Sequence, residues 1–276
     1  MDVRQEIFPA RRIWPQAIHD VSEISAEATE VRLVSRAKNL RKLSTLTRLK
    51  ALWCFDINHE ALDSIGNCVS LESLFIENLK TGDVACLKSL RNLLTLSLDS
   101  CSKITSLEFL VRLPALRGLA IINFKNVHDL TPVAAMTSLR FLAIAGSMWT
   151  RMKVASFDPL SHLPGLEFLH LTNIKADDSS LEPLATLSHL KLLDIANFYP
   201  MNEFARLSRK LSTTECTWFH PFLAVQKSMV CKKCRMHTMV MLTGRRNRIL
   251  CTDCDGERLE RHIKEWNYAS AERSRV

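Results

Sequence analysis

A single spacing of apolar residues recurs along most of the chain and constrains its fold more than any other feature. The pattern Leu-x-x-Leu-x-Leu, with Cys or Ile in some positions, begins at Leu49, Leu71, Leu93, Leu116, Leu139, Leu166 and Leu190. These starts lie 22, 22, 23, 23, 27 and 24 residues apart, and a weaker copy begins at Ala28. A unit of this length is too small to bury its own apolar face, so neighbouring units must stack around one continuous core.

The segments between these patterns are also regular. Apolar residues stand three and six positions before every start, as Leu90 and Leu87 do before Leu93. Proline suits the first turn of a short helix, and it stands seven positions before the last three starts, as Pro132, Pro159 and Pro183. Each repeat is therefore predicted to hold one strand and one short helical turn. The fold class is α/β, a solenoid with a parallel sheet on its concave face.

The repeat resembles the leucine-rich-repeat family, in particular the short 22-residue bacterial class. In that class Leu-x-Pro-Leu-x-x-Leu-x-x-Leu joins one strand to the next, and Leu181 to Leu190 matches it. The resemblance covers about residues 28–200. The family's Asn after the strand is replaced here, but Asn78, Asn123, Asn173 and Asn197 stand one position earlier. This leaves open either a shifted Asn ladder or another way of satisfying the backbone polar groups of those turns.

The repeats at 28–200 need covers at both ends. Residues 1–27, which contain Trp14, are predicted to form the N-terminal cap, and residues 201–227 the C-terminal cap and linker. Within the latter, Phe204, Leu207 and Leu211 share one helical face, and three aromatic residues are expected to cover the last repeat: Trp218, Phe219 and Phe222.

The concave face is predicted to carry the side chains that lie between the core leucines, because strand side chains alternate. Exposed aromatic surface usually marks an interaction site. The candidate partner-binding residues are therefore Trp53, Phe55, Phe75, Ile122, Phe141, Phe168 and His170. In the alternative interpretation, the terminal segments fold over some of them. The extra residues 145–156, which contain Trp149, are either a loop on the binding face or a tolerated surface loop.

Four cysteines near the C-terminus have the spacing of a metal site. Cys231-x-x-Cys234 and Cys251-x-x-Cys254 are separated by 16 residues, which matches the spacing of four-cysteine zinc sites. Residues 238–242 and 249–250 read as the strands of a hairpin that turns at Gly244. This resembles the zinc-ribbon class, and residues 228–256 are assigned to it. A site closed by four thiolates is expected to hold one structural zinc ion.

Residues 257–276 are predicted to form a terminal helix. Leu259, Ile263 and Trp266 give it one apolar stripe. We expect this stripe to pack on the ribbon or on the cap; the alternative is that it docks a partner.

The net charge of +8 is concentrated in the C-terminal part of the chain. Residues 1–204 hold 22 basic and 22 acidic side chains, whereas residues 205–276 hold 15 and 7. Basic clusters bind phosphates, so the ribbon carries the alternative function of nucleic-acid binding. The residues assigned to it are Lys232, Lys233, Arg235, Arg245, Arg246 and Arg248.

Other functions find little support. The chain has no Gly-rich phosphate loop, nucleophile elbow or His-Glu-x-x-His motif, so neither catalysis nor a small-molecule substrate is expected. No apolar run reaches membrane-span length, and the first residues do not read as a signal peptide. The expectation is a cytoplasmic adaptor with reduced thiols, which binds a protein partner through the concave face and binds no membrane.

Overall fold

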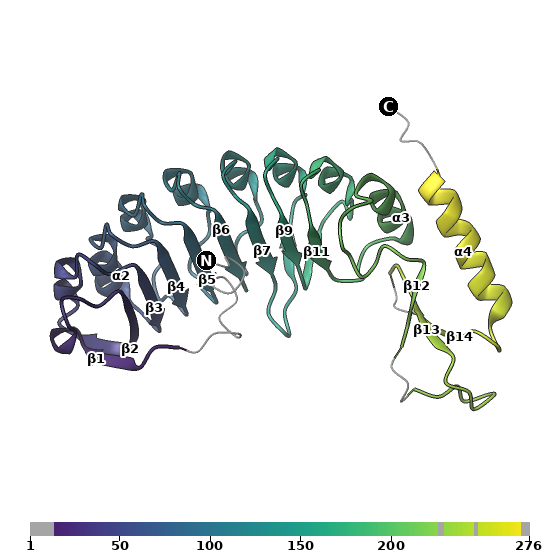
Figure 1. The fold of residues 1–276 in the computed structure, drawn as a ribbon, viewed down its shortest axis with the longest axis horizontal. Coiled ribbons are helices and arrows are strands. Elements are labelled where there is room, and N and C mark those ends of the chain that lie inside the picture. The colour runs from purple at the N-terminus through teal and green to yellow at the C-terminus, as the bar shows by residue number, and fades with distance from the viewer. Residues whose placement is uncertain (1–13, 226–228, 246–247, 272–276) are drawn as a thin grey trace.

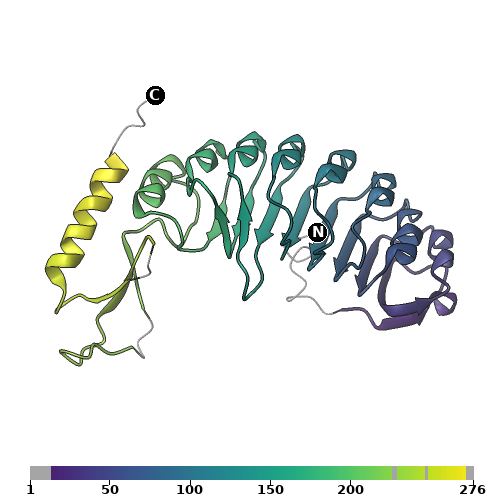
Figure 2. The same ribbon diagram turned by 180° about the vertical axis from the view of Figure 1, so that it is seen from behind.

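A computed structural model describes residues 14–225, 229–245 and 248–271. Stacked repeats form a curved nine-stranded parallel sheet in the order β1-β2-β3-β4-β5-β6-β7-β9-β11 (Figures 1 and 2). The strands are β1 (Ala17–Asp20), β2 (Glu30–Lys38), β3 (Ala51–Phe55), β4 (Ser73–Glu77), β5 (Thr95–Asp99), β6 (Gly118–Ile122), β7 (Phe141–Ala145), β9 (Phe168–Leu171) and β11 (Leu192–Ile195). The predicted leucine-rich-repeat solenoid is confirmed.

The opposite, convex side carries one short helical segment in most repeats. Most of these are 3₁₀ turns, and the three predicted prolines lie in the first turns of the last three. The segments are η2 (Val21–Glu23), η3 (Leu40–Thr45), α2 (His59–Gly66), η4 (Ala85–Ser89), η5 (Glu108–Arg112), η6 (Thr131–Ala135), η7 (Asp158–His162) and η8 (Glu182–Thr186). No helix among the described residues is long and apolar enough to span a membrane.

The repeated leucines form the core between the two sides. All seven leucines that start the pattern, and the seven that follow three positions later, are at most 2% exposed. All of them lie in one continuous cluster of buried residues that runs from Val21 to Ala269. Each repeat therefore buries its apolar side chains against the next one, as the sequence predicts.

A row of left-handed residues ends the strands. Asp56, Asn78, Ser100, Asn123 and Asn173 have φ between 47° and 61°. Asn is tolerated in this region better than most residues, because its side chain can form local hydrogen bonds. The Asn123 side chain donates to the Ser100 hydroxyl at 3.0 Å, and Asn78 bonds to Asp56. The ladder of Asn one position early is thus present in part. Asp56, Ser100 and Gly146 stand at three of its positions.

The longest repeat contains a small second sheet. Strand β8 (Met152–Val154) pairs in parallel with β10 (Ile174–Ala176), and the preceding loop projects between β7 and β9 (Figure 1). Met148 and Trp149 in this loop are 83% and 89% exposed. The structure leaves both predicted roles of this loop open.

The C-terminal part packs against the last repeat. Helix α3 (Met201–Lys210) buries Phe204 and Leu207, as predicted. Strands β12 (Phe222–Ala224), β13 (Met239–Leu242) and β14 (Ile249–Cys251) form an antiparallel sheet, followed by α4 (Gly256–Ala271). The hairpin is where the sequence predicts it, and Gly244 has φ of 116°.

One feature of this region differs from the sequence-based expectation. Phe222 belongs to β12, a third strand of the ribbon sheet, and packs in the ribbon cluster, whereas Trp218 and Phe219 pack against the solenoid core. The stripe of α4 packs on the ribbon and on the cap, as predicted. Leu259 and Ile263 pack on the ribbon, and Trp266 joins the solenoid core.

We expect Asn123→Val to destabilise the protein by about 2 kcal/mol, because a β-branched residue is strained at positive φ and the bond to Ser100 is lost. Asn123→Gly, which fits the same backbone conformation, should cost less than half as much. Urea unfolding followed by circular dichroism measures both. Equal losses would show that the left-handed conformation does not limit this position.

Candidate functional site

Four thiols form a compact group in the ribbon. The Sγ atoms of Cys231, Cys234, Cys251 and Cys254 all lie within 4.8 Å of one another. Cys231 Sγ is 3.9 Å from Cys254 Sγ, and Cys234 Sγ is 3.6 Å from Cys251 Sγ. Zinc–thiolate bonds of about 2.3 Å in a tetrahedron place the sulfurs about 3.8 Å apart. The donor set and its spacing could therefore hold a metal ion.

Two tight turns present these thiols. In the first, the Arg235 amide donates to the carbonyl of Cys231 at 3.0 Å, and Arg235 itself has φ of 63°. In the second, the Asp255 amide donates to the carbonyl of Cys251 at 2.9 Å, while the Cys251 amide donates to the Asp255 carboxylate at 3.2 Å. Each turn thus presents one pair of sulfurs.

The surroundings of the four thiols give them different pKa values. The Thr238 hydroxyl lies 3.4 Å from Cys251 Sγ and lowers the pKa of that thiol to about 6. Hydrogen bonding to the Cys234 sulfur, followed by burial, raises the pKa of Cys254 to about 12. Neighbouring thiols cannot all ionise at neutral pH unless a cation offsets their mutual repulsion.

The other five cysteines belong to the solenoid and the cap. All nine cysteines are free thiols. Burial raises the pKa of Cys68, Cys101 and Cys216 to about 12, and that of Cys54 still further. Buried thiols with raised pKa values are unreactive, which agrees with the core positions predicted for them.

The seven candidate partner-binding residues all lie on the concave sheet or at its edge, but they are not equally exposed. Trp53, Phe75 and Phe141 are only 2, 4 and 3% exposed, so the expectation of an exposed aromatic strip is wrong for these three. The remaining four are half-buried: Phe55, Ile122, Phe168 and His170.

Trp14 explains the burial at the first repeats. Its ring lies 6.4 Å from Trp53, 5.2 Å from Phe55 and 5.3 Å from Phe75, measured between ring centroids. The Arg32 guanidinium lies 5.4 Å from the Trp14 ring centroid and 5.1 Å from that of Phe55. A residue of the predicted N-terminal cap therefore covers the face of the sheet. Three further apolar residues of that cap, Ile7, Phe8 and Ile13, lie outside the described residues.

A second apolar group lies farther along the same face. The rings of Phe141 and Phe168 stack with centroids 5.8 Å apart, beside Ala120 and Ala143, which are fully buried. Ile122 packs at the edge of this group.

Polar side chains flank these groups. Nδ1 of His170 lies 2.8 Å from the Asp194 carboxylate, and its Nε2 lies 2.6 Å from the Thr172 hydroxyl. At the ends of β4 and β5, Glu77 and Asp99 are direct neighbours. Burial, followed for Glu77 by repulsion from Asp99, raises the pKa values of both carboxyls. The concave face is thus acidic along one margin.

The residues assigned to nucleic-acid binding lie in two parts of the ribbon. Lys232, Lys233 and Arg235 are in the first metal-site turn, and Arg245 and Arg248 flank the hairpin loop. All five are exposed, and Lys233 lies 3.7 Å from the Asp255 carboxylate. Arg246 lies outside the described residues.

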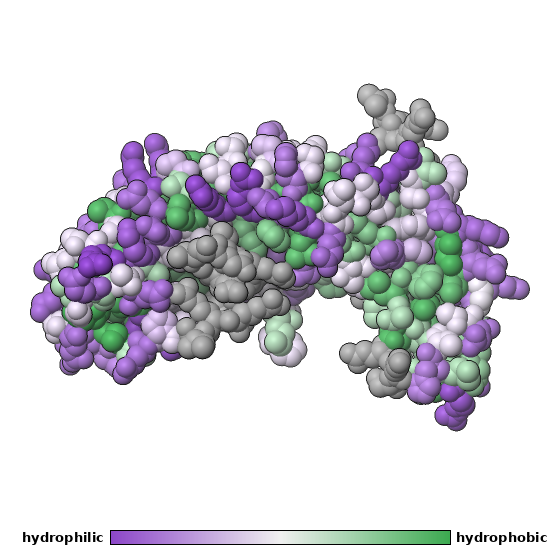
Figure 3. Space-filling view, in the orientation of Figure 1, coloured by the Kyte–Doolittle hydropathy of each residue, from purple (hydrophilic) through white to green (hydrophobic). Residues whose placement is uncertain are grey.

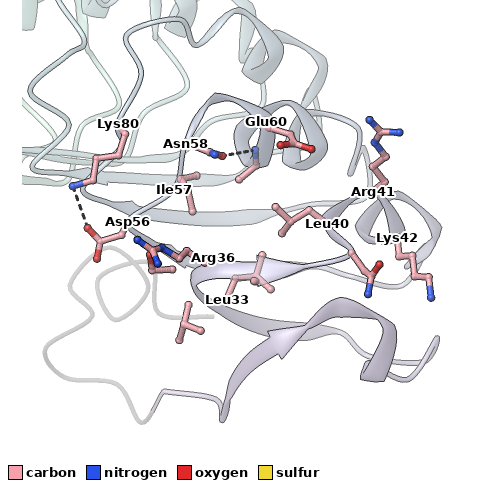
Figure 4. Close-up of a pocket in the computed structure, with 15 residues that line it drawn as sticks. Leu33, Arg36, Leu40, Arg41, Lys42, Asp56, Ile57, Asn58, Glu60 and Lys80 are labelled. Atoms are coloured by element: carbon pink, nitrogen blue, oxygen red, sulfur yellow. Dashed lines mark hydrogen bonds and ion pairs between the residues drawn. The ribbon is translucent and has the colours of Figure 1, made fainter.

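One pocket has no counterpart in the sequence analysis. It has a volume of about 850 Å³ and opens beside Leu33, Arg36, Leu40, Asp56 and Ile57 (Figure 4). The pairing of β2 with β3 ends at Leu33 and Cys54, whereas that of β3 with β4 continues to Phe55 and Glu77. The pocket arises where β2 turns away from β3. In the sequence, the feature that corresponds to it is the weak first repeat.

The chain has likenesses among known proteins, although no family model matches it. It is 30% identical over 200 residues to a Trypanosoma equiperdum protein named "Putative adenylate cyclase regulatory protein", covering 70% of this chain and 29% of that protein. The chain therefore spans less than a third of the length of this curated relative.

Solved structures share the architecture. A leucine-rich-repeat protein of Leptospira interrogans matches with a TM-score of 0.58 and 18% identity, over 73% of this chain and 52% of that one. TLR13, in its complex with an ssRNA, matches with a TM-score of 0.50 and 19% identity, over 62% and 26%. At these identities the likeness shows that the chain has the leucine-rich-repeat fold.

We expect Trp14→Ala to lower the free energy of unfolding by on the order of 2 kcal/mol, because it removes a ring that contacts three other aromatic residues. It should also increase binding of a hydrophobic dye, since Trp53 and Phe75 lose their cover. Trp149→Ala is the matched control; its exposed side chain should change stability by less than about 0.5 kcal/mol. Similar small effects of both changes would contradict the assigned role of Trp14.

Proposed function

We propose that this chain is a non-catalytic protein-interaction module that binds a partner on the concave face of its solenoid. The observation that carries the proposal is the row of half-buried side chains on this curved sheet, from Phe55 through Ile122 to Phe168 and His170. Partly exposed aromatic and aliphatic side chains on a rigid surface supply binding energy at low entropic cost. Stacked repeats create extended concave surfaces of this kind.

The acidic residues along one margin of the concave face indicate the charge of the partner. Glu77 and Asp99 are the last residues of β4 and β5, and Asp194 lies beside His170. Asp56 directly follows β3 and pairs with Lys80 at 3.2 Å. A partner with basic side chains along one edge and apolar ones at its centre would complement this face. The regulatory role named for the Trypanosoma equiperdum relative is compatible with partner binding, since regulators act by contacting other proteins.

For the ribbon we propose one zinc ion, held by the four thiolates and purely structural. Four sulfur donors near tetrahedral spacing suit zinc, and a closed four-thiolate site leaves no position for a substrate. The ion would hold the two turns together by joining Cys231 and Cys234 to Cys251 and Cys254. For a segment of this size, metal binding supplies folding energy on the order of 10 kcal/mol.

Removal of the metal should unfold the ribbon and spare the solenoid. The purified protein should contain one zinc per chain by elemental analysis, and Cys251→Ser with Cys254→Ser should abolish it. Amide exchange should then become fast in residues 229–271, while β3 to β9 keep their protection. Cys86→Ser, at a half-buried thiol outside the group, serves as the control and should retain the metal. A metal-free wild type with a protected ribbon would refute the structural role.

Partner binding can be tested at the half-buried positions. A photo-crosslinking residue placed at Phe168 should capture a protein from the native lysate, and one at Arg112 on the convex side should not. Ile122→Ala with Phe168→Ala should then weaken binding of that protein at least tenfold, which corresponds to about 1.4 kcal/mol. Captured material that nuclease destroys, or binding that the double variant leaves unchanged, would count against the concave face.

A further inference from the structure

The ribbon sheet has two faces, and the structure covers one of them. Val240 and Leu250 pack against Leu259 and Ile263 of α4. Side chains alternate along strands, so the residues between these point to the opposite side. There, Leu223 pairs directly with Met241, and Met241 with Ile249, which forms one row across all three strands.

This outer row is apolar and partly exposed. Ile249 is 36% exposed, and Leu223 and Met241 are half-buried, as is Met239 on the same face. The apolar surface continues at the first metal-site turn, where Met229, Val230 and Met236 are 42, 38 and 54% exposed. Hydrophobic residues gather over β12 to β14 in the space-filling view (Figure 3). Methionine adapts to irregular partners, and contiguous apolar surface usually marks an interaction site.

The charge around this face is mostly positive, although Asp253 of the second turn lies close by and accepts from the Thr238 hydroxyl at 2.9 Å. Between residues 229 and 251 the sequence holds six basic and no acidic side chains. Lys232, Arg235, Arg245 and Arg248 are exposed. Lys233 of this segment pairs with Asp255 at 3.7 Å. Any segment that lies on the outer row would therefore meet cations at both ends of the sheet, which favours an acidic occupant.

The amino-acid composition of the ribbon favours an acidic peptide over a nucleic acid as the partner. Proteins that bind single-stranded nucleic acid stack bases on aromatic rings, and residues 223–251 contain no Phe, Tyr or Trp. Phosphate contacts alone would use the cations and leave the Leu223–Met241–Ile249 row without a role. An amphipathic peptide uses both, since its apolar side chains cover the row while its carboxylates reach the lysines and arginines.

We propose that the outer face of the ribbon sheet binds an acidic, amphipathic segment of a protein partner. The row of Leu223, Met241 and Ile249 takes the apolar side chains. Arg245 and Arg248 at the hairpin, with Lys232 and Arg235 at the turn, take the carboxylates. This surface is distinct from the concave face, and its test does not depend on partner binding there.

Selection from a phage-displayed library of random dodecapeptides, with the full chain in its metal-loaded form as bait, tests the proposal. We expect enriched peptides to combine Asp and Glu with Leu, Ile or Phe. A representative peptide should bind at least tenfold more weakly to Ile249→Asp, and also to Arg245→Glu with Arg248→Glu. Lys88→Glu with Arg112→Glu, on the convex side, is the charge-matched control and should bind like the wild type.

Metal content shows whether each variant is folded, and Ile249→Gln replaces Ile249→Asp if the latter loses its metal. Selected peptides without acidic enrichment, or equal binding by the wild type and both ribbon variants, would overturn the proposal. Binding of a labelled random single-stranded oligonucleotide tests the alternative that the ribbon binds nucleic acid. The ribbon is a nucleic-acid surface instead if this oligonucleotide binds saturably at physiological salt and competes with the peptide. In that case Arg245→Glu with Arg248→Glu should weaken its binding, whereas Ile249→Gln, which adds no charge, should not.

Discussion

The burial of each repeat's leucines against the next repeat is the interaction on which the rest of the structure depends. A single unit of some 22 residues contributes one strand, one short helical turn and a few apolar side chains. These side chains leave water only when a neighbour is stacked on them, and at about 25 cal/mol per Å² of apolar surface the gain grows with every added repeat. The first and last repeats therefore have faces that other parts of the chain must cover.

The C-terminal cover is more than an apolar lid. Asn197, at the end of the last repeat, donates to the Leu242 carbonyl at 3.0 Å and accepts from the Gly244 amide at 2.6 Å. A Cβ at Gly244 would lie 3.0 Å from that of Met201, so the close approach favours glycine there. Arg209 of α3 donates to the carbonyls of Ser270 and Ala271 at the end of α4. The ribbon and α4 are thus joined to the solenoid by polar contacts at both ends.

The repeat register could be predicted from the sequence because leucine at a fixed period reports burial directly. The four-cysteine group could be predicted too, since metal ligands within a turn have restricted spacing. The position of Trp14 could not, because nothing local tells whether a tryptophan before the first strand covers the end of a sheet or its face. As a result, Trp53 and Phe75 read as exposed from their strand positions although a distant residue buries them.

Other differences have equally specific causes. Strand β12 spans only three residues and is defined by its pairing with β13, so its own sequence carries no clear strand signal. From the sequence, Asn197 is expected to belong to the Asn ladder, but its side-chain amide donates instead to the Leu242 carbonyl in the ribbon. The pocket beside Arg36 depends on where β2 leaves β3, which the spacing of leucines does not determine. In each case the missing information lies in contacts between residues distant in sequence.

The clamp that Asn197 forms with residues 242 and 244 has a geometric consequence. A ribbon on a flexible tether would sample many orientations, whereas this one is held at a set angle to the sheet. A protein that touches both the concave face and the ribbon would pay the cost of losing its rotational freedom once, and its second contact would form at a high effective concentration. If both proposed surfaces contact one partner, the fixed angle makes the chain select partners by the distance between their two binding segments.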